Sequence, residues 1–299
     1  MIMEKQRCSN IELCRLASIL CVMVVHSTFQ SLGFNVSFGV LLTAGFSIIG
    51  VDVFVMLAGY FTAVPKKTSI INLAFICLFW MVVRLAFRFG FGSSVAYSSF
   101  FFITSSNWFI PAYFGLLFFA PILNLFCAQV NKKTLWTMVI ILLIIEIWFD
   151  WLPPHPAISL GSNWGHSVLS FLILYLLARA IRLHGLPDWF KKYSLVIYLG
   201  CSLILALMAF VVLRLGHIGL VRWCFADNNP IVILSSVAFL TVFEQMKMPQ
   251  SNLINYLAKS TLAVLLGHSA IFFLYKKQFN YLYTNYSGLQ VVLYWAQEA

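Results

Sequence analysis

Hydrophobic residues fall into long blocks along the chain, and short polar segments separate the blocks. Most blocks are about 18–25 residues long, which matches the length that a helix needs to cross a hydrocarbon core of about 30 Å. The pattern predicts membrane-spanning helices at 11–32, 38–63, 70–90, 108–128, 135–152, 167–183, 194–213, 229–246, 261–278 and 288–299. The last block covers only about half a membrane thickness, so we expect a short or truncated final helix.

The composition supports a membrane protein. Hydrophobic residues make up 62% of the 299 positions and charged residues only 9%, whereas a soluble domain carries roughly 25% charged residues. The mean hydropathy is +0.92. The alternating pattern of a transmembrane β-barrel is absent. We therefore predict an all-α polytopic bundle of about ten transmembrane helices, with residues 1–299 forming a single integral-membrane domain.

The basic residues lie mainly between the predicted spans and indicate the orientation. If the N-terminus is cytoplasmic, thirteen of the 19 Lys and Arg residues fall on the cytoplasmic side, which is the bias expected of inner-membrane proteins. The net charge of +10 therefore reflects topology, and nucleic acid is not an expected partner. The seven cysteines are scattered and mostly lie inside spans, so they predict neither a disulfide framework nor a metal site.

Two ionisable residues share one face of the first predicted span. Arg15 and His26 lie eleven residues apart in an otherwise apolar stretch. Eleven helical steps return a side chain to within about 20° of its starting direction, about 16 Å further along the axis. Ionisable groups at this depth are costly and usually functional. Arg15 is a candidate for binding a phosphate, and His26 for proton transfer. The structural alternatives are a pair of Arg15 with Glu12 and a bond from a neutral His26 to a neighbouring helix.

The second predicted span contains a carboxylate, Asp52, in an apolar run. A buried carboxylate needs a partner, and His26 or a basic group is the candidate. A carboxylate that binds one imidazole nitrogen orients the ring. The alternative is a structural bond between helices, with Gly50 and Gly59 permitting close packing.

Candidates for substrate binding lie on later spans and loops. Trp108 and Tyr113 open the fourth span, where aromatic residues anchor helices at the membrane interface. The loop that ends at His166 combines aromatic, amide and imidazole groups, which suits a sugar and equally suits an ordinary interfacial loop. His268 is a second mid-membrane imidazole, which we expect near His26. Two histidines without a third ligand are weak grounds for a metal, and we predict none.

A series of motifs occurs in a fixed order along the chain. They are Arg15-x10-His26, the run from Gly50 to Tyr60, Trp108-Phe-Ile-x-x-Tyr113 with Pro121-Ile-Leu-Asn124, Phe171-Leu-Ile-Leu-Tyr-Leu-Leu177 followed by Arg182, Asn229-Pro-Ile231, and Ser260-Thr-Leu-Ala-Val-x-x-x-His268. This ordered set, which spans about residues 7 to 275, resembles the membrane acyltransferase-3 family of bacterial integral-membrane acyltransferases. The chain departs from the family pattern in its short last span and at Gly267, where an apolar residue is usual.

The resemblance implies transfer of an acyl group, usually acetyl from acetyl-CoA, to a hydroxyl of a cell-surface or lipid-linked glycan. His26 would be the catalytic imidazole, Asp52 would orient it, and Arg15 would meet the donor from the cytoplasmic side. Lys66 and Lys67, which stand where the family often has an arginine pair, would attract the polyanionic donor. Acetyl-CoA would act as a substrate, and no permanently bound cofactor is expected.

A proton-coupled transporter or flippase of a glycan or lipid is the rival interpretation, with His26, Asp52 and Arg15 forming a relay. Inverted repeats with paired broken helices would favour it, and the sequence contains none. Within the acyltransferase hypothesis, His26 either deprotonates the acceptor or carries the acetyl group itself. The sequence determines neither the acceptor, the acyl chain nor the oligomeric state.

Overall fold

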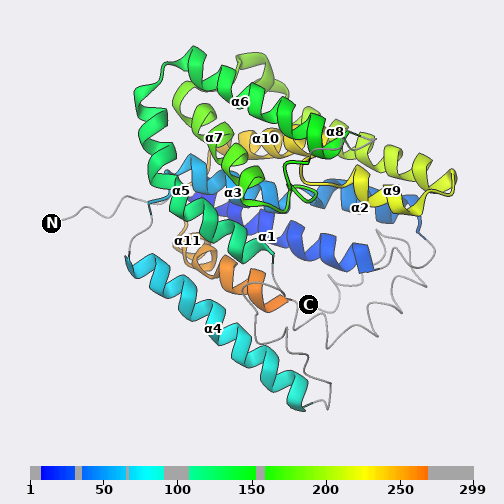
Figure 1. Ribbon diagram of the computed structural model, residues 1–299, viewed down its shortest axis with the longest axis horizontal. Helices are drawn as coiled ribbons and strands as arrows, with labels where there is room; N and C mark the ends of the chain where they lie inside the picture. The colour runs from blue at the N-terminus through cyan, green and yellow to red at the C-terminus, as the bar shows by residue number, and fades with distance from the viewer. Residues whose placement is uncertain (1–7, 31–35, 65–66, 91–107, 153–158, 269–299) are drawn as a thin grey trace.

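The computed structural model describes residues 8–30, 36–64, 67–90, 108–152 and 159–268, and regular structure in these ranges is helical throughout (Figure 1). The helices are α1 (Ser9–Gln30), α2 (Phe38–Ser47), α3 (Gly50–Tyr60), α4 (Lys67–Gly90), α5 (Phe109–Gln129), α6 (Lys132–Glu146), α7 (Val168–His184), α8 (Asp188–Arg214), α9 (Ile218–Cys224), α10 (Pro230–Gln245) and α11 (Asn252–Leu257). A π-helical turn, η4 (Ile147–Trp151), extends α6. A 3-10 turn, η5 (Ala258–Ser260), joins α11 to a helical segment at 261–268.

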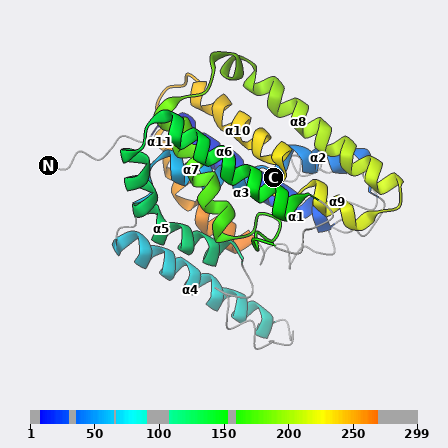
Figure 2. The ribbon, with the colours of Figure 1, turned by 45° about the horizontal axis from the view of Figure 1, so that its top comes forward.

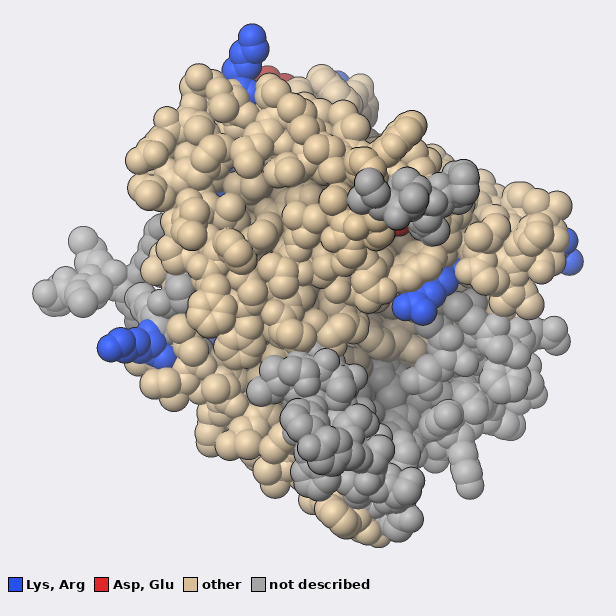
Figure 3. Space-filling model, viewed as in Figure 1, with Lys and Arg blue, Asp and Glu red and all other residues tan. Residues whose placement is uncertain are grey.

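Several helices are long and apolar enough to cross a membrane. They occupy Ser9–Thr28, Phe38–Tyr60, Phe109–Gln129, Lys132–Trp151 and Asp188–Arg214, and shorter apolar helices lie at Ile70–Val83 and Pro230–Gln245. Figure 3 shows a face that is almost entirely uncharged, with Lys and Arg in a few separate places. The prediction of an all-helical protein with membrane-length apolar helices is confirmed.

The helix boundaries differ from the predicted spans in three ways. The span predicted at 38–63 consists of two helices, α2 and α3, with a turn at residues 48–49. The short helices α9 and α11 lie in segments that we expected to be connections, because each is too short to produce the long apolar block of a span. The span predicted at 288–299 lies outside the described residues.

Polar residues begin many of the helices. Ser37, Asn131, Ser167, Asn229 and Ser251 are N-caps whose side chains accept a hydrogen bond from a backbone N–H of the first turn. Pro230 occupies the first turn of α10, where its missing N–H has no consequence. These caps satisfy backbone donors that the apolar flanks of the helices cannot.

Helix α1 lies at the centre of the bundle, where it packs against α2, α3, α10 and α11. Around it, α3 packs on α7, while α2 and α10 both pack on α8. Helix α4 lies at one side of the bundle in both Figure 1 and Figure 2. This arrangement buries Glu12, Ser18 and Thr28 of α1, while Arg15 is partly buried and His26 lies at an accessible position.

Three glycines allow α2 and α3 to approach their neighbours closely. A Cβ atom at Gly45 would meet the backbone of α8, one at Gly50 the backbone of α1, and one at Gly59 the backbone of α7. Small residues at such positions let membrane helices pack at short range. The predicted role of Gly50 and Gly59 in close packing is confirmed.

Candidate active site: two cavities along one helix

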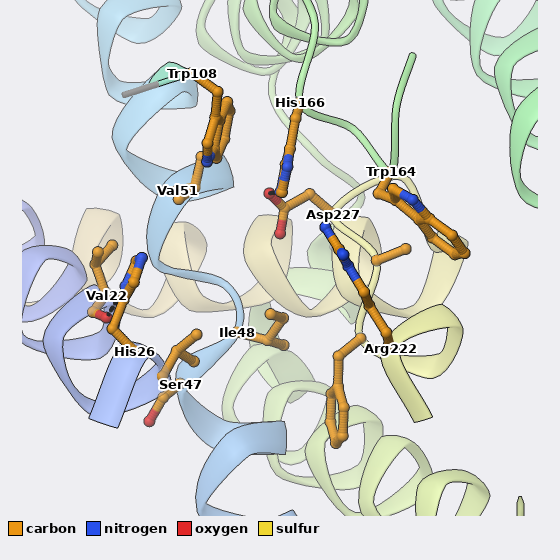
Figure 4. Close-up of a pocket in the computed structure, with 13 residues that line it drawn as sticks. Val22, His26, Ser47, Ile48, Val51, Trp108, Trp164, His166, Arg222 and Asp227 are labelled. Atoms are coloured by element: carbon orange, nitrogen blue, oxygen red, sulfur yellow. Dashed lines mark hydrogen bonds and ion pairs between the residues drawn. The ribbon is translucent and has the colours of Figure 1, made fainter. Parts of the chain in front are cut away.

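A cavity of about 360 Å³ lies beside the C-terminal half of α1. Its wall comes from α1, the turn between α2 and α3, the residue before α5, the loop before α7, and α9 with the segment that follows it (Figure 4). The polar and aromatic side chains that line it are His26, Ser47, Trp108, Trp164, His166, Arg222 and Asp227. We call it the histidine cavity. Its volume lies in the range of small-ligand sites.

His26 reaches this cavity from α1, and its own helix holds the ring. Its Nδ1 atom lies 2.7 Å from the carbonyl oxygen of Val22, one turn earlier. Because a carbonyl oxygen can only accept, Nδ1 carries the proton, and Nε2 of the neutral ring keeps a free lone pair. The ring of His268 lies with its centroid 4.7 Å from that of His26. The two histidines are therefore neighbours, but His268 is not among the residues that line the cavity.

Another imidazole in the same cavity, His166, pairs with a carboxylate. Its Nε2 atom lies 3.3 Å from Oδ2 of Asp227, whose side chain is 6% exposed. The Trp108 ring stacks on the imidazole, with ring centroids 3.7 Å apart and an angle of 12° between the planes. The structure thus brings together His26, His166 and Trp108, all three of which the sequence singles out. It adds Asp227, which the sequence analysis missed.

The loop before α7 is fixed to the end of η4 by Asp150. The carboxylate accepts hydrogen bonds from the backbone N–H of Leu160 at 3.1 Å and of Ser162 at 3.3 Å. It also accepts one from the hydroxyl of Ser159. A buried carboxylate with several donors is well satisfied, so this loop is an ordered part of the cavity wall.

Asp52 does not bind His26. It is fully buried on α3, and its Oδ2 atom accepts a hydrogen bond from the hydroxyl of Ser236 on α10 at 3.4 Å. The predicted pairing with His26 is wrong, because the packing of α3 on α10 brings the Asp52 carboxylate to Ser236. The carboxylate that pairs with an imidazole in this cavity is Asp227.

A smaller cavity, of about 230 Å³, lies near the other end of α1. Its lining includes Arg15, Tyr113, Lys259 and Thr261, and we call it the arginine cavity. Nε of Arg15 lies 3.3 Å from Oε2 of Glu12, which confirms the predicted pair. Tyr113 therefore lies with Arg15 rather than with His26. The exposed ammonium group of Lys259 adds a second cation that the sequence analysis did not single out.

Helix α1 connects the two cavities. Arg15 lines one and His26 the other, and α1 is helical without interruption between them. The predicted separation of about 16 Å along one helix face therefore applies. The helical segment 261–268 also extends from one cavity toward the other, because Thr261 lines the arginine cavity and His268 lies beside His26.

The predicted lysine pair does not lie at the arginine cavity as far as the structure describes it. Lys66 lies outside the described residues. Lys67 is exposed at the start of α4 and is not part of the cavity lining. The lysine at that cavity is Lys259 instead.

Gly267 is explained by its contact with α4. The indole ring of Trp80 occupies the space that a Cβ atom at residue 267 would take. An apolar side chain before His268 would therefore displace Trp80 or move the helical segment.

Comparison of the chain with protein-family models, with curated proteins and with solved structures finds no match. The chemistry of the two cavities is therefore the basis for assigning a function. One cavity presents Arg15 and Lys259, and the other presents imidazoles, a carboxylate, the guanidinium group of Arg222 and indole rings.

Proposed function

We propose that the protein is a membrane O-acyltransferase, related to the acyltransferase-3 family, that moves an acetyl or similar acyl group from cytoplasmic acyl-CoA to a hydroxyl of a cell-surface or lipid-linked glycan. The observation that carries the proposal is the position of Arg15 and His26 on one continuous helix, each lining its own cavity. A donor with a charged end and a distant reactive thioester fits this arrangement.

The arginine cavity suits the charged end of the donor. Guanidinium and ammonium groups form strong, charge-assisted hydrogen bonds with phosphate oxygens. Arg15 and Lys259 supply these two groups, and Tyr113 and Thr261 add hydroxyls. Lys66 and Lys67 contribute longer-range attraction for the same polyanion.

The histidine cavity suits the thioester end of the acyl-CoA donor and the hydroxyl group of the acceptor sugar. Nε2 of His26 has a free lone pair, so it can attack the acyl carbon as a nucleophile or accept a proton as a base. Trp108 and Trp164 offer indole surfaces, and polar groups lie around them. A sugar presents apolar ring faces and hydroxyl edges, and this lining matches both.

We further propose a bundle of about ten spans in the inner membrane, with the N-terminus in the cytoplasm. Helices lie at each of the predicted spans that the described residues include, and the distribution of Lys and Arg gives the orientation. In this topology the arginine cavity faces the cytoplasmic side, from which acyl-CoA arrives.

The test is release of free CoA thiol from acetyl-CoA by the purified full-length protein, with radiolabelled acetyl followed into membrane glycolipids. We expect His26→Ala to lower transfer by at least about 100-fold, the contribution of a general base or nucleophile. His217→Asn is the matched control, because His217 is exposed and outside both cavities. Normal transfer by His26→Ala would end the proposal, and proton-coupled flux without CoA release would favour the transporter.

A further inference from the structure

The loop that carries His166 has an unusual backbone. Asn163 and Trp164 both have positive φ, at 48° and 67°. Asparagine tolerates this conformation, but a bulky residue such as tryptophan adopts it only where its surroundings impose it. Strained backbone of this kind clusters at functional sites.

The strain is held in place by the segment that carries Asp227. The backbone N–H of Asp227 donates to the carbonyl oxygen of Trp164 at 3.0 Å. The side-chain amide of Asn228 donates to the hydroxyl of Ser162 at 3.0 Å. These two bonds join segments that are distant in the sequence, directly beside the His166–Asp227 pair.

Gly165 makes this junction possible. It has a φ of 89°, and a Cβ atom there would lie 2.6 Å from Cβ of Asp227 and 2.8 Å from the backbone nitrogen of Asn228. Only glycine fits this contact. The backbone on both sides of the pair is therefore built to bring the imidazole and the carboxylate together.

The pair and its stacking partner favour a histidine that accepts a proton. Asp227 binds Nε2 of His166, so the neutral ring carries its proton on Nε2 and has its free lone pair on Nδ1. When Nδ1 takes a proton, the new positive charge is attracted by the Asp227 carboxylate and by the face of the Trp108 ring. The direct contact of Asp227 is with His166, whereas Nδ1 of His26 bonds the backbone carbonyl of its own helix.

We propose that His166, oriented by Asp227, is the base that takes the proton from the acceptor hydroxyl, while His26 acts on the acyl donor. This inference rests on the proposed acyltransferase function and divides its chemistry between two imidazoles. The acceptor O–H bond breaks and its proton moves to Nδ1 of His166. The acceptor oxygen forms a bond to the acyl carbon as the bond between that carbon and the CoA sulfur breaks. His166 then releases its proton to solvent and the CoA thiolate takes up one proton from solvent, so CoA leaves as the thiol and the imidazole returns to its neutral form.

The experiment compares His166→Asn, Asp227→Asn and Asp227→Glu with His217→Asn in the purified full-length protein, with radiolabelled acetyl-CoA and membrane glycolipid as substrates. We expect His166→Asn to lower kcat by about 100- to 10,000-fold, the range for a general base. The KM for acetyl-CoA should stay unchanged, because the arginine cavity is untouched. Asp227→Glu should recover part of the activity that Asp227→Asn loses.

The split between kcat and KM, together with rescue by a carboxylate, separates a positioning role of Asp227 from a merely structural one. We expect Asp227→Asn to lower kcat while the KM for acetyl-CoA stays at the wild-type value. Asp227→Glu should recover part of that kcat, because a carboxylate can again bind Nε2 of His166. Equal losses in Asp227→Asn and Asp227→Glu, or a KM that changes along with kcat, would contradict the role of Asp227.

The outcomes distinguish the two proposals. A wild-type protein that never releases CoA overturns the proposed function. A wild-type protein that transfers acetyl, with His166→Asn within about threefold of it, overturns only the assignment of His166. If His166→Asn does not fold, as judged by thermal unfolding in detergent, the comparison of kcat in Asp227→Asn and Asp227→Glu decides.

Discussion

The histidine cavity and the arginine cavity share α1 but are constructed differently. In the first, His26 and Arg222 come from helices, whereas His166 and Asp227 come from irregular segments that are fixed by hydrogen bonds, a stacked ring and a strained backbone. In the second, the cations Arg15 and Lys259 come from a regular helix and a short turn. Proton transfer depends on accurate geometry, whereas attraction of a polyanion depends mainly on charge. Under the proposed function, the first cavity would therefore carry the chemistry and the second would bind the donor.

Gly50→Leu should have the largest effect, because it disturbs the scaffold of both cavities. A Cβ atom at Gly50 would lie 2.7 Å from the carbonyl oxygen of Ser18, and backbone on α1 cannot move aside as a side chain can. We expect loss of monodisperse, folded protein on size-exclusion chromatography, since overpacking of this kind costs about 1–3 kcal/mol or more.

The matched control is Gly200→Ala on α8, where a new Cβ atom would meet no atom within 4 Å. It should fold and behave as wild type, because alanine is the better helix former. A folded and active Gly50→Leu protein would mean that α1 and α3 are not packed as described.

Lys259→Gln should have an intermediate effect that is confined to the donor. We expect the KM for acetyl-CoA to rise about three- to tenfold with kcat unchanged, and the effect to shrink at high salt, because Lys259 is exposed and its charge is screened. Lys247→Gln is the control, because Lys247 is exposed but lies outside the cavity lining. An equal rise in KM for both variants would assign the attraction to overall charge instead of the cavity.

Asp52→Asn should have the smallest effect on catalysis. Asp52 binds Ser236 and not His26, so we expect kcat to stay within about tenfold of wild type, well short of the loss of a general base. The same radiolabel assay measures it beside Asp227→Asn. If Asp52→Asn lowers kcat as much as Asp227→Asn does, Asp52 has the orienting role that the sequence predicts for it.

Much of the fold follows from the sequence because its signal is local. A helix that crosses lipid needs apolar residues over its whole length, and this places the long helices. The shared face of Arg15 and His26 follows from the helical period alone. The pair of Glu12 and Arg15 follows in the same way.

The remainder of the site depends on contacts that sequence periodicity does not encode. Asp227 meets His166 because two irregular segments, far apart in the chain, are joined by backbone bonds and by the close approach of Gly165. Lys259 lies on the turn η5, whose direction depends on how α11 packs on α1. The sequence predicts the wrong partner for Asp52, because the packing of α3 on α10 determines its contact with Ser236 and residue spacing along the chain does not encode that packing.

The close contacts of Gly45, Gly50 and Gly59 also have a mechanical consequence. They join α2 and α3 to three different helices, with no side chain between the backbones at these points. Helices that are packed this closely cannot easily slide past one another, because closely packed interiors resist deformation. We therefore expect the centre of the bundle to behave as one stiff frame, unlike the rocking halves of an alternating-access transporter.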